Sequence, residues 1–486
     1  MHVSPQAVGI VHFVGIGGIG MSGIAEILHS LGYLVQGSDL SESINVKRLM
    51  AKGIAVKIGH TAENIDHASV LVVSSAVRQD NPELIAARQR MLPIVHRAEM
   101  LAELMRLKPS IAVAGTHGKT TTTSLGATVL EEAGWQPTVV SGGIINSFGT
   151  NAKLGAGEWV IVEADESDGS FVKLPATHAI ITNIDPEHME HYGSTEALYE
   201  AFVRFIENIP FYGLGIVCAD HPGVQKIIPR LTDRRLVTYG FGAAVDVKAS
   251  NVRLNTDGAT FDVVISDRMH EICPRSARYK EFKDVHVRVM GEHNVLNALS
   301  ILALSLELGL SEMEIRQGFA SFAGVGRRFT KTGEVAGVSV IDDYAHHPAE
   351  IRAVLKTARA IAPSRVLAVF QPHRYSRLSH LFEEFCEAFE DMDHLLVTPI
   401  YSAGEDPIPG LNHETFVEKA TQMYDQPVEG VMSEVELFER LAHVAQPGDM
   451  IICMGAGNIT AWAHAMPDQL QGIWERKMNM KKGAVT

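Results

Sequence analysis

The sequence predicts an α/β protein built from three domains. Its 486 residues exceed the roughly 250 to 300 residues at which a single hydrophobic core stops growing. Three segments each begin with an apolar, β-rich run, pass through a glycine-rich or polar turn and continue into a helical pattern. We place the domains at residues 1–108, 109–325 and 326–486, because helical stretches stop before Pro109 and before the glycines around Val325.

Composition narrows the class of protein. No apolar run approaches the ~20 residues that cross a bilayer, and the first residues lack a basic signal-peptide region, so we expect a cytoplasmic protein without membrane contact. A net charge of -15 disfavours binding to nucleic acid. The four cysteines form no CxxC pair, which argues against a zinc site or a disulfide framework. The sequence predicts no oligomeric state.

A glycine-rich turn follows the first predicted strand, residues 8–14, and precedes a helix with Met21, Ile24 and Leu28 on one face. The turn has the spacing GxGxxG, and its glycines are Gly15, Gly17, Gly18 and Gly20. Such a turn lets backbone amides approach a diphosphate, and Asp39 lies about 20 residues further on, where an acidic group meets a ribose hydroxyl. The motif fits a nicotinamide dinucleotide, a UDP-sugar or a purely structural turn.

A second phosphate-binding loop follows the predicted strand at residues 111–114. Its residues are Gly115, Thr116, His117, Gly118, Lys119, Thr120 and Thr121. Backbone amides there can cradle phosphates, Lys119 can neutralise them and the Thr120 hydroxyl can ligate magnesium. The loop reads GxxGKT rather than GxxxxGK[ST], because Val113 occupies the first glycine position. A glycine-lysine-threonine turn between strand and helix favours ATP binding over a structural role.

Acidic residues follow two more predicted strands of the central segment. Residues 159–162 lead into an acidic run that begins at Glu163, and residues 179–182 lead into a loop that ends at His188. In an open α/β sheet, ligands collect outside the carboxyl ends of the strands. Acids there can hold the Mg²⁺ that bridges ATP phosphates, whereas an isolated acidic run is usually a solvated loop.

Polar residues also follow two predicted strands of the carboxyl-terminal segment. Residues 338–341 lead to Tyr344 and His346, and residues 366–370 lead to Arg374 and Arg377. Because arginine offers a planar fork that matches a carboxylate, the two arginines are candidate carboxylate anchors. The alternative is a pair of surface arginines engaged in salt bridges.

Taken together, the motifs resemble the Mur ligase family. The matching strings run in order through all three segments: HFVGIGGIGMSGIAE, GTHGKTTT, EADESDGSF, TNIDPEHMEHYG, GEHNVLNAL, GVGRRF, DDYAHHPAEI and QPHRYSRL. The resemblance implies a Rossmann-like first domain that binds a UDP-sugar and a central ATP-binding domain of the P-loop type. It also implies a Rossmann-like third domain that brings an amino acid.

The resemblance also implies roles for single residues. ATP would contact the phosphate loop together with His293, Asn294, Asn297 and Arg327. The UDP-sugar would contact Gly15, Gly17, Gly18, Gly20, Asp39 and Ser74. The metal ligands would be Thr120, Glu163 and His188, and the catalytic set Lys119, Glu163 and His188. The amino acid would contact Tyr344, His346, Arg374 and Arg377.

Within the family, the strings look most like members that join L-alanine to UDP-N-acetylmuramate, using ATP and an acyl phosphate, in peptidoglycan precursor synthesis. A related recycling ligase that attaches a preformed tripeptide to the same sugar nucleotide is the nearest alternative. A nicotinamide dehydrogenase is suggested only by the first glycine-rich turn. A regulator that binds nucleotides without turnover is the third alternative.

Overall fold

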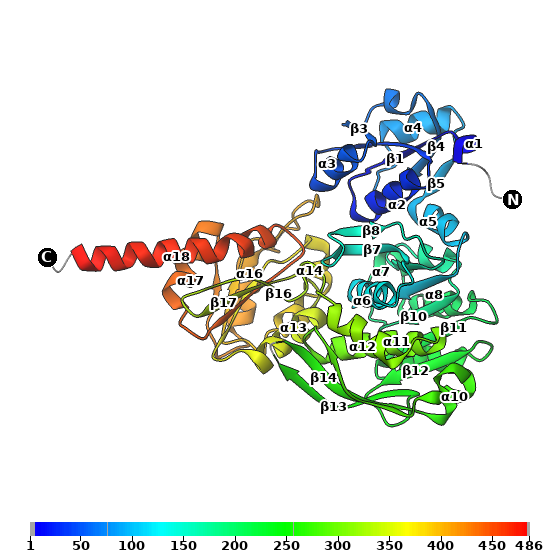
Figure 1. The fold of residues 1–486 in the computed structure, drawn as a ribbon. Coiled ribbons are helices and arrows are strands. Elements are labelled where there is room, and N and C mark those ends of the chain that lie inside the picture. Colours follow the sequence, from blue (N-terminus) through cyan, green and yellow to red (C-terminus); the bar gives the residue numbers. More distant parts are fainter. Residues whose placement is uncertain (1–4, 75, 256, 484–486) are drawn as a thin grey trace. The chain divides into compact units, whose positions relative to one another are not determined.

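A computed structural model describes residues 5–74, 76–255 and 257–483 of the chain (Figure 1). The chain forms three β-sheets and divides into two compact units. The first unit comprises residues 1–252, 260–288 and 294–325, and the second comprises residues 253–259, 289–293 and 326–486. The predicted α/β architecture is confirmed, and each of the three predicted segments contains one of the three sheets.

The amino-terminal sheet is a five-stranded parallel sheet of the doubly wound type. Its strands, from edge to edge, are β3 (Ala55–Ile58), β2 (Leu34–Asp39), β1 (Ile10–Val14), β4 (Ala68–Val73) and β5 (Ile94–His96). Its helices are α1 (Pro5–Val8), α2 (Ile19–Ser30), α3 (Ile44–Ala51), η1 (Ala62–Ile65), α4 (Pro82–Gln89) and α5 (Arg97–Met105). The first strand begins two residues later than predicted, because α1 extends through Val8.

The central sheet has ten strands. From edge to edge they are β15 (Glu281–Val287), β14 (Gly258–Ile265), β13 (Val247–Asn255), β12 (Leu236–Gly240), β11 (Leu214–Cys218), β10 (His178–Ile181), β6 (Ser110–Ala114), β9 (Val160–Glu163), β7 (Thr138–Ile145) and β8 (Thr150–Lys153). The strand before the phosphate loop, β6, lies between β10 and β9 and is parallel to both. The carboxyl ends of these three strands therefore meet at one edge of the sheet.

Most helices of the central part connect these strands, and α11 and α12 follow the last of them. They are α6 (Lys119–Glu132), η2 (Ser170–Lys173), α7 (Met189–Tyr192), α8 (Thr195–Glu207), α9 (Pro222–Ile227), η3 (Ile228–Arg230), α10 (Asp267–Ile272), η4 (Pro274–Arg278), α11 (Glu292–Leu308) and α12 (Glu312–Ser321). The phosphate-loop helix α6 is buried along most of its length. The antiparallel β7–β8 pair lies against α2, and Asn151 of β8 donates to the Ile19 carbonyl of α2 at 2.6 Å (Figure 1).

The third sheet has six strands. They are, in order, β16 (Thr330–Val335), β17 (Val338–Asp343), β21 (Met450–Met454), β18 (Val366–Phe370), β19 (His394–Val397) and β20 (Val428–Gly430). Only β16 is antiparallel to its neighbour, so the other five strands form a parallel sheet. Its helices are α13 (Pro348–Ile361), α14 (Tyr375–His380), α15 (Phe382–Cys386), α16 (His413–Thr421), α17 (Glu434–Val444) and α18 (Ile459–Gly483). Among the residues that the structure describes, no helix is both long and apolar enough to cross a bilayer.

A buried histidine lies at the start of β10, at the end of the sheet opposite to the phosphate loop. His178 is 5% exposed, and its ring stacks on Trp159 with 5.6 Å between ring centroids. Burial lowers the pKa of the His178 imidazole to about 4. The folded chain therefore holds this ring neutral at pH values where an unfolded chain would protonate it.

We expect His178 to make the fold acid-sensitive between pH 6.5 and pH 4. As the pH falls through this window, the unfolded state binds a proton that the native state does not, so stability is lost. From pH 6.5 to pH 5 the loss is about 2 kcal/mol for one such group. In urea unfolding, His178→Gln should flatten this part of the pH dependence, whereas exchange of the exposed His443 should not. Equal pH slopes in wild type and His178→Gln would contradict the assignment.

Candidate active site

The amino-terminal glycine-rich turn is held by the end of the neighbouring strand β2. The amides of Gly15 and Ile16 both donate to the Ser38 carbonyl at 2.9 Å. The Gly17 amide donates to Asp39 Oδ2 at 2.8 Å, and a Cβ at Gly17 would lie 2.8 Å from that same oxygen. Only glycine therefore lets the turn approach Asp39 this closely. The predicted contact residue Asp39, at the end of β2, is thus in direct contact with the turn.

The other residues predicted for the sugar nucleotide lie at the same edge. Gly18 precedes α2, and its amide donates to the Gly15 carbonyl at 3.2 Å. Gly20 abuts Arg97, whose Nη1 would lie 2.8 Å from an added Cβ. Ser74 directly follows β4, which is the parallel neighbour of β1. The structure therefore brings all six predicted residues to the carboxyl edge of one sheet.

The phosphate loop is fastened to the residues that follow β10. The side-chain amide of Asn183 accepts from the His117 amide at 2.7 Å and donates to the His117 carbonyl at 2.9 Å. Thr182 Oγ1 donates to the same carbonyl at 2.6 Å. Gly115 and Gly118 have φ values of +131° and +82°, which side chains rarely adopt. Asn183 was not predicted to anchor the loop.

Lys119 lies at the centre of this part of the site. Its Nζ donates to the carbonyls of Gly115 and Thr116 at 2.6 and 3.0 Å and forms an ion pair with Glu166 at 2.7 Å. Burial opposes the charge, but the carboxylates of Glu166 and Glu163 outweigh it and raise the pKa of the Lys119 ammonium. The lysine therefore stays charged at neutral pH and can neutralise phosphate oxygens.

Two of the predicted metal ligands are in direct contact. Thr120 Oγ1 donates to Glu163 Oε1 at 3.1 Å, and the Gly142 amide of β7 donates to Glu163 Oε2 at 2.7 Å. A Cβ at Gly142 would lie 2.5 Å from the Glu163 carboxylate, so the close approach requires glycine. The carboxylate is thus fixed beside the first turn of α6, where phosphate oxygens are expected.

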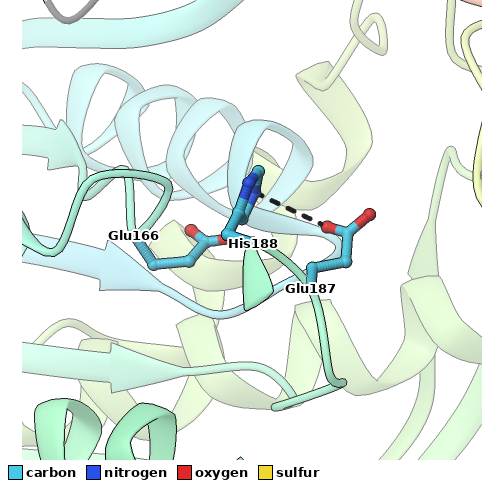
Figure 2. Close-up of side chains that lie close together, drawn as sticks. All are labelled: Glu166, Glu187 and His188. Carbon is cyan, nitrogen blue, oxygen red and sulfur yellow. Dashed lines mark ion pairs between the residues drawn. The ribbon is translucent and has the colours of Figure 1, made fainter. Parts of the chain in front are cut away.

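The third predicted ligand, His188, belongs to a second cluster with Glu166 and Glu187. One ligand atom from each of the three side chains lies within 4.8 Å of the others. Figure 2 shows Glu166 on the loop after β9, and Glu187 and His188 on the loop after β10. His188 has φ +57° and pairs with Glu187 at 3.9 Å and Glu190 at 3.6 Å. The predicted ligands thus fall into two groups.

The donors of both groups fit a magnesium site. Mg²⁺ prefers carboxylate and hydroxyl oxygens, which Thr120, Glu163, Glu166 and Glu187 supply. Glu166 connects the two groups. Its carboxylate pairs with Lys119, and the Lys119 ammonium is also attracted by the Glu163 carboxylate. Glu166 and Glu187 were not predicted as metal ligands. Both stand within the acidic motifs, but the sequence does not indicate which acid of a run turns toward the loop.

Asp185 holds the phosphate loop through its carboxylate and its backbone amide. Its carboxylate pairs with His117 Nε2 at 3.3 Å and with His221 Nε2 at 3.4 Å. Its backbone amide donates to Thr116 Oγ1 at 2.8 Å. Although burial opposes it, hydrogen bonding to the two histidines lowers the pKa of the Asp185 carboxyl far below its ordinary value. Asp185 and His221 were not predicted, because His221 comes from the separate loop after β11.

The residues predicted to contact adenine lie on the first turns of α11. His293 and Asn294 follow its first residue, and Asn297 Nδ2 donates to Asn294 Oδ1 at 2.9 Å. Asn297 is 5% exposed and lies against the phosphate loop, since a Cβ at Gly118 would be 2.8 Å from its Oδ1. Asn297 is therefore beside the loop.

In the second unit, the predicted residues Arg327 and Tyr344 contact each other. The Arg327 guanidinium lies 4.6 Å from the centre of the Tyr344 ring and donates to the Gly455 carbonyl at 2.7 Å. The buried Asp343 carboxylate accepts the amides of Phe329 and Ala345, each at 2.7 Å. It thereby fixes a turn in which Arg327 and Phe329 both have positive φ. Asp343 was not predicted.

A histidine pair links the predicted amino-acid residues that follow β17 and β18. The ring of His346 lies 4.9 Å from that of Tyr344 and 6.1 Å from that of His373. Arg377 Nη1 lies 3.3 Å from His373 Nδ1. Burial and the nearby positive groups lower the pKa of His373 to about 3, so its ring is neutral. Tyr344, His346 and Arg377 are thus brought together through His373, which was not predicted.

The two arginines predicted as carboxylate anchors differ in their side-chain partners. Arg374 has φ +68°, donates its amide to the Tyr401 carbonyl at 2.8 Å and pairs with Glu405 at 3.7 Å. Arg377 faces the neutral His373 instead. Because a carboxylate ligand would compete with Glu405 for Arg374, Arg377 is the stronger candidate anchor.

We predict that Gly118→Ala weakens ATP binding by about tenfold or more. The new Cβ would face Asn297 Oδ1 at 2.8 Å and would strain a backbone at φ +82°, displacing the loop amides. The matched control is Gly134→Ala at the far end of α6, where φ is +77° and no atom lies within 4 Å of the new Cβ. Isothermal titration calorimetry compares the ATP affinities of the two variants. Unchanged affinity in Gly118→Ala would be the contrary result.

Known proteins match the chain over nearly its full length. The Mur ligase family, catalytic domain, matches residues 10–109, its middle domain residues 113–305 and its glutamate ligase domain residues 327–457. A UDP-N-acetylmuramate--L-alanine ligase from Acidiphilium cryptum is 54% identical over 98% of both chains. The solved UDP-N-acetylmuramate-alanine ligase from Thermotoga maritima has a TM-score of 0.79 and 30% identity over 96% of this chain and 99% of its own. A murein peptide ligase from Psychrobacter arcticus shares the fold, with a TM-score of 0.69 and 23% identity over 95% and 99%. The chain belongs to the Mur ligase family.

Proposed function

We propose that the chain joins L-alanine to the carboxylate of UDP-N-acetylmuramate in peptidoglycan precursor synthesis. ATP would phosphorylate that carboxylate to an acyl phosphate and leave as ADP. The amine of L-alanine would then attack the acyl carbon, forming the amide and releasing phosphate and a proton. The relative from Acidiphilium cryptum, 54% identical over 98% of this chain, carries the name of this activity.

The observation that carries the proposal is the phosphate loop with its buried, charged lysine. Lys119, Thr120 and Glu163 lie together where β6 and β9 end, which suits phosphoryl transfer. The chemistry of a nicotinamide dehydrogenase does not require such a phosphate loop, so the loop argues against that alternative. The amino-terminal turn, on a different sheet, would hold the sugar nucleotide through Gly17 and Asp39.

Magnesium is the proposed metal. Thr120 and Glu163 would hold one ion, and His188, with Glu166 and Glu187, would supply further ligands. Bound there, Mg²⁺ would offset the negative charge of the ATP phosphates. The Lys119 ammonium adds a fixed positive charge, and the burial of its pair with Glu166 keeps bulk water from screening it.

The amino acid would be held by the second unit. Arg377 would bind its carboxylate, with the neutral His373 fixing the guanidinium, and Tyr344 and His346 would line the same place. Arg374 would contribute once a ligand carboxylate displaces Glu405. Arg327 would reach the ATP phosphates, and His293, Asn294 and Asn297 would contact adenine.

Lys119→Ala should abolish phosphate release with ATP, Mg²⁺, UDP-N-acetylmuramate and L-alanine. The variant loses the ammonium that neutralises phosphate charge, while the sugar-nucleotide turn on the other sheet stays intact. UDP-N-acetylmuramate binding should therefore be retained in titration calorimetry. Lys153→Ala is the matched control and should keep full turnover, since it removes a more exposed ion pair between Lys153 of β8 and Glu131 of α6. Near-normal turnover of Lys119→Ala would falsify the assignment.

Arg377→Ala should raise KM for L-alanine by about tenfold or more, because a charge-assisted hydrogen bond contributes roughly 1.5–3 kcal/mol. KM for ATP should stay unchanged. Arg359→Ala is the matched control, since Arg359 of α13 pairs with Asp393, which directly precedes β19 at the amino ends of the parallel strands. Steady-state kinetics with each substrate varied in turn separate these effects. If Arg377→Ala and Arg359→Ala have the same KM for L-alanine, Arg377 does not bind the amino acid.

A further inference from the structure

A network of buried polar side chains lies behind the amino-terminal glycine-rich turn, with Glu83 at its centre. Glu83 lies in the first turn of α4 and, like His12 and Ser38, is 0% exposed. Its Oε2 accepts the Ser38 hydroxyl at 2.7 Å and His12 Nε2 at 3.2 Å. Its Oε1 accepts Asn64 Nδ2 at 2.6 Å. Both carboxylate oxygens are thus engaged by donors from separate elements.

The direction of each hydrogen bond follows from the donors available. The Gln36 side-chain amide donates to His12 Nδ1 at 3.1 Å, which leaves the His12 ring proton on Nε2, facing Glu83. The Ser38 hydroxyl gives its single proton to Glu83. His60 Nδ1, 3.0 Å from Ser38 Oγ, must therefore carry a proton and donate. All the groups around Glu83 are donors, which suits an ionised carboxylate.

The ionised state also follows from the local balance of forces. Burial opposes it, but hydrogen bonds from His12, Asn64 and Ser38 outweigh burial and lower the pKa of the Glu83 carboxyl. A buried carboxylate without such partners would cost several kcal/mol. The fold therefore keeps an ionised carboxylate buried at Glu83, and it does so by surrounding the carboxylate with donors.

The network ends on the backbone that forms the sugar-nucleotide turn. Ser38, held by Glu83 through its side chain, accepts the amides of Gly15 and Ile16 through its carbonyl. The next residue, Asp39, accepts the Gly17 amide through its carboxylate. A shift of Ser38 would therefore move the amides of the turn.

A second branch reaches the same strand end from the other side. Asn64, whose Nδ2 donates to Glu83, also donates to the Gly59 carbonyl at 3.0 Å. The Gly59 amide in turn donates to the Asp39 carbonyl at 2.8 Å. Glu83 thus braces Asp39 both through Ser38 and through Asn64.

We propose that Glu83 is a positioning residue for the sugar-nucleotide site. It would not touch the substrate. Through Ser38 and Asn64 it holds Asp39 and the turn amides in the arrangement that receives the diphosphate and ribose. This inference rests on the proposed function, because it assigns the turn to UDP-N-acetylmuramate. A carboxylate with only a stabilising role would change the unfolding temperature and leave sugar-nucleotide affinity alone.

The test is the affinity of Glu83→Gln for UDP-N-acetylmuramate, measured by titration calorimetry without ATP. Glutamine keeps the shape but turns an NH₂ group toward donors, so one side of the network loses its acceptor. We expect Kd to rise about tenfold or more and the KM for the sugar nucleotide to rise with it. The values of kcat and of KM for ATP should change less than about twofold, because the phosphate loop lies on another sheet.

Two further variants keep the test decisive. Glu307→Gln is the matched control: Glu307 is a mostly buried carboxylate of the central sheet region that accepts both Arg235 nitrogens, at 2.8 and 3.0 Å. It should lower the unfolding temperature without changing Kd. If Glu83→Gln does not fold, Ser38→Ala decides, since it removes one arm of the network and should raise Kd about threefold or more.

The outcomes separate this inference from the proposed function. Failure of the wild-type chain to bind UDP-N-acetylmuramate would refute the proposed function. Wild-type binding with an unchanged Kd in folded Glu83→Gln, or in Ser38→Ala where that variant decides, would overturn the positioning role alone. An equal rise of Kd in Glu307→Gln would also overturn it, because the effect would then follow from general destabilisation.

Discussion

The buried ammonium of Lys119 is the interaction on which the central site depends. A charge in this position requires partners, and the chain provides the Gly115 and Thr116 carbonyls and the Glu166 carboxylate. Glu166 can reach Lys119 only because β9 lies directly beside β6. The order of the strands in the sheet is therefore what lets an acidic run 47 residues further along the chain complete the phosphate loop.

The same constraint recurs in all three sheets. In each, parallel neighbours bring strand ends that are distant in sequence to one edge, and glycine or polar side chains follow those ends. In the amino-terminal sheet, Asp39 after β2 meets Gly17 after β1. In the third sheet, β17 and β18 both pair with β21, and residues that follow these two strands meet through the rings of His346 and His373. In the proposed reaction, all three sheets supply ligand contacts.

Much of this could be predicted from the sequence, because strands, glycine turns and helix starts are local. The predicted strand at residues 366–370 coincides with β18, and α13 begins at Pro348 as expected. The ten-stranded central sheet and the β7–β8 pair were not predicted, since strand order depends on long-range packing. Asn183 and Glu166 stood inside motifs, but their partners depend on the path of the loop. Glu83 had no local signal, because it reads as an ordinary helix residue.

The choice of acceptor distinguishes the proposed function from its nearest alternative, the related recycling ligase that attaches a preformed tripeptide to the same sugar nucleotide. Arg377 and His373 suit the carboxylate of any amino acid or peptide, so this part of the site alone does not discriminate. Discrimination must come from how the remainder of the acceptor is accommodated, and this can be measured directly.

The most direct measurement is phosphate release by the purified chain with ATP, Mg²⁺ and UDP-N-acetylmuramate, comparing L-alanine, glycine, L-serine and the recycling tripeptide as acceptors. Mass spectrometry of the products would run in parallel. The proposed function predicts the fastest release with L-alanine and a product of the mass of UDP-N-acetylmuramoyl-L-alanine. Faster release with the tripeptide, or no release that depends on an acceptor, would contradict it.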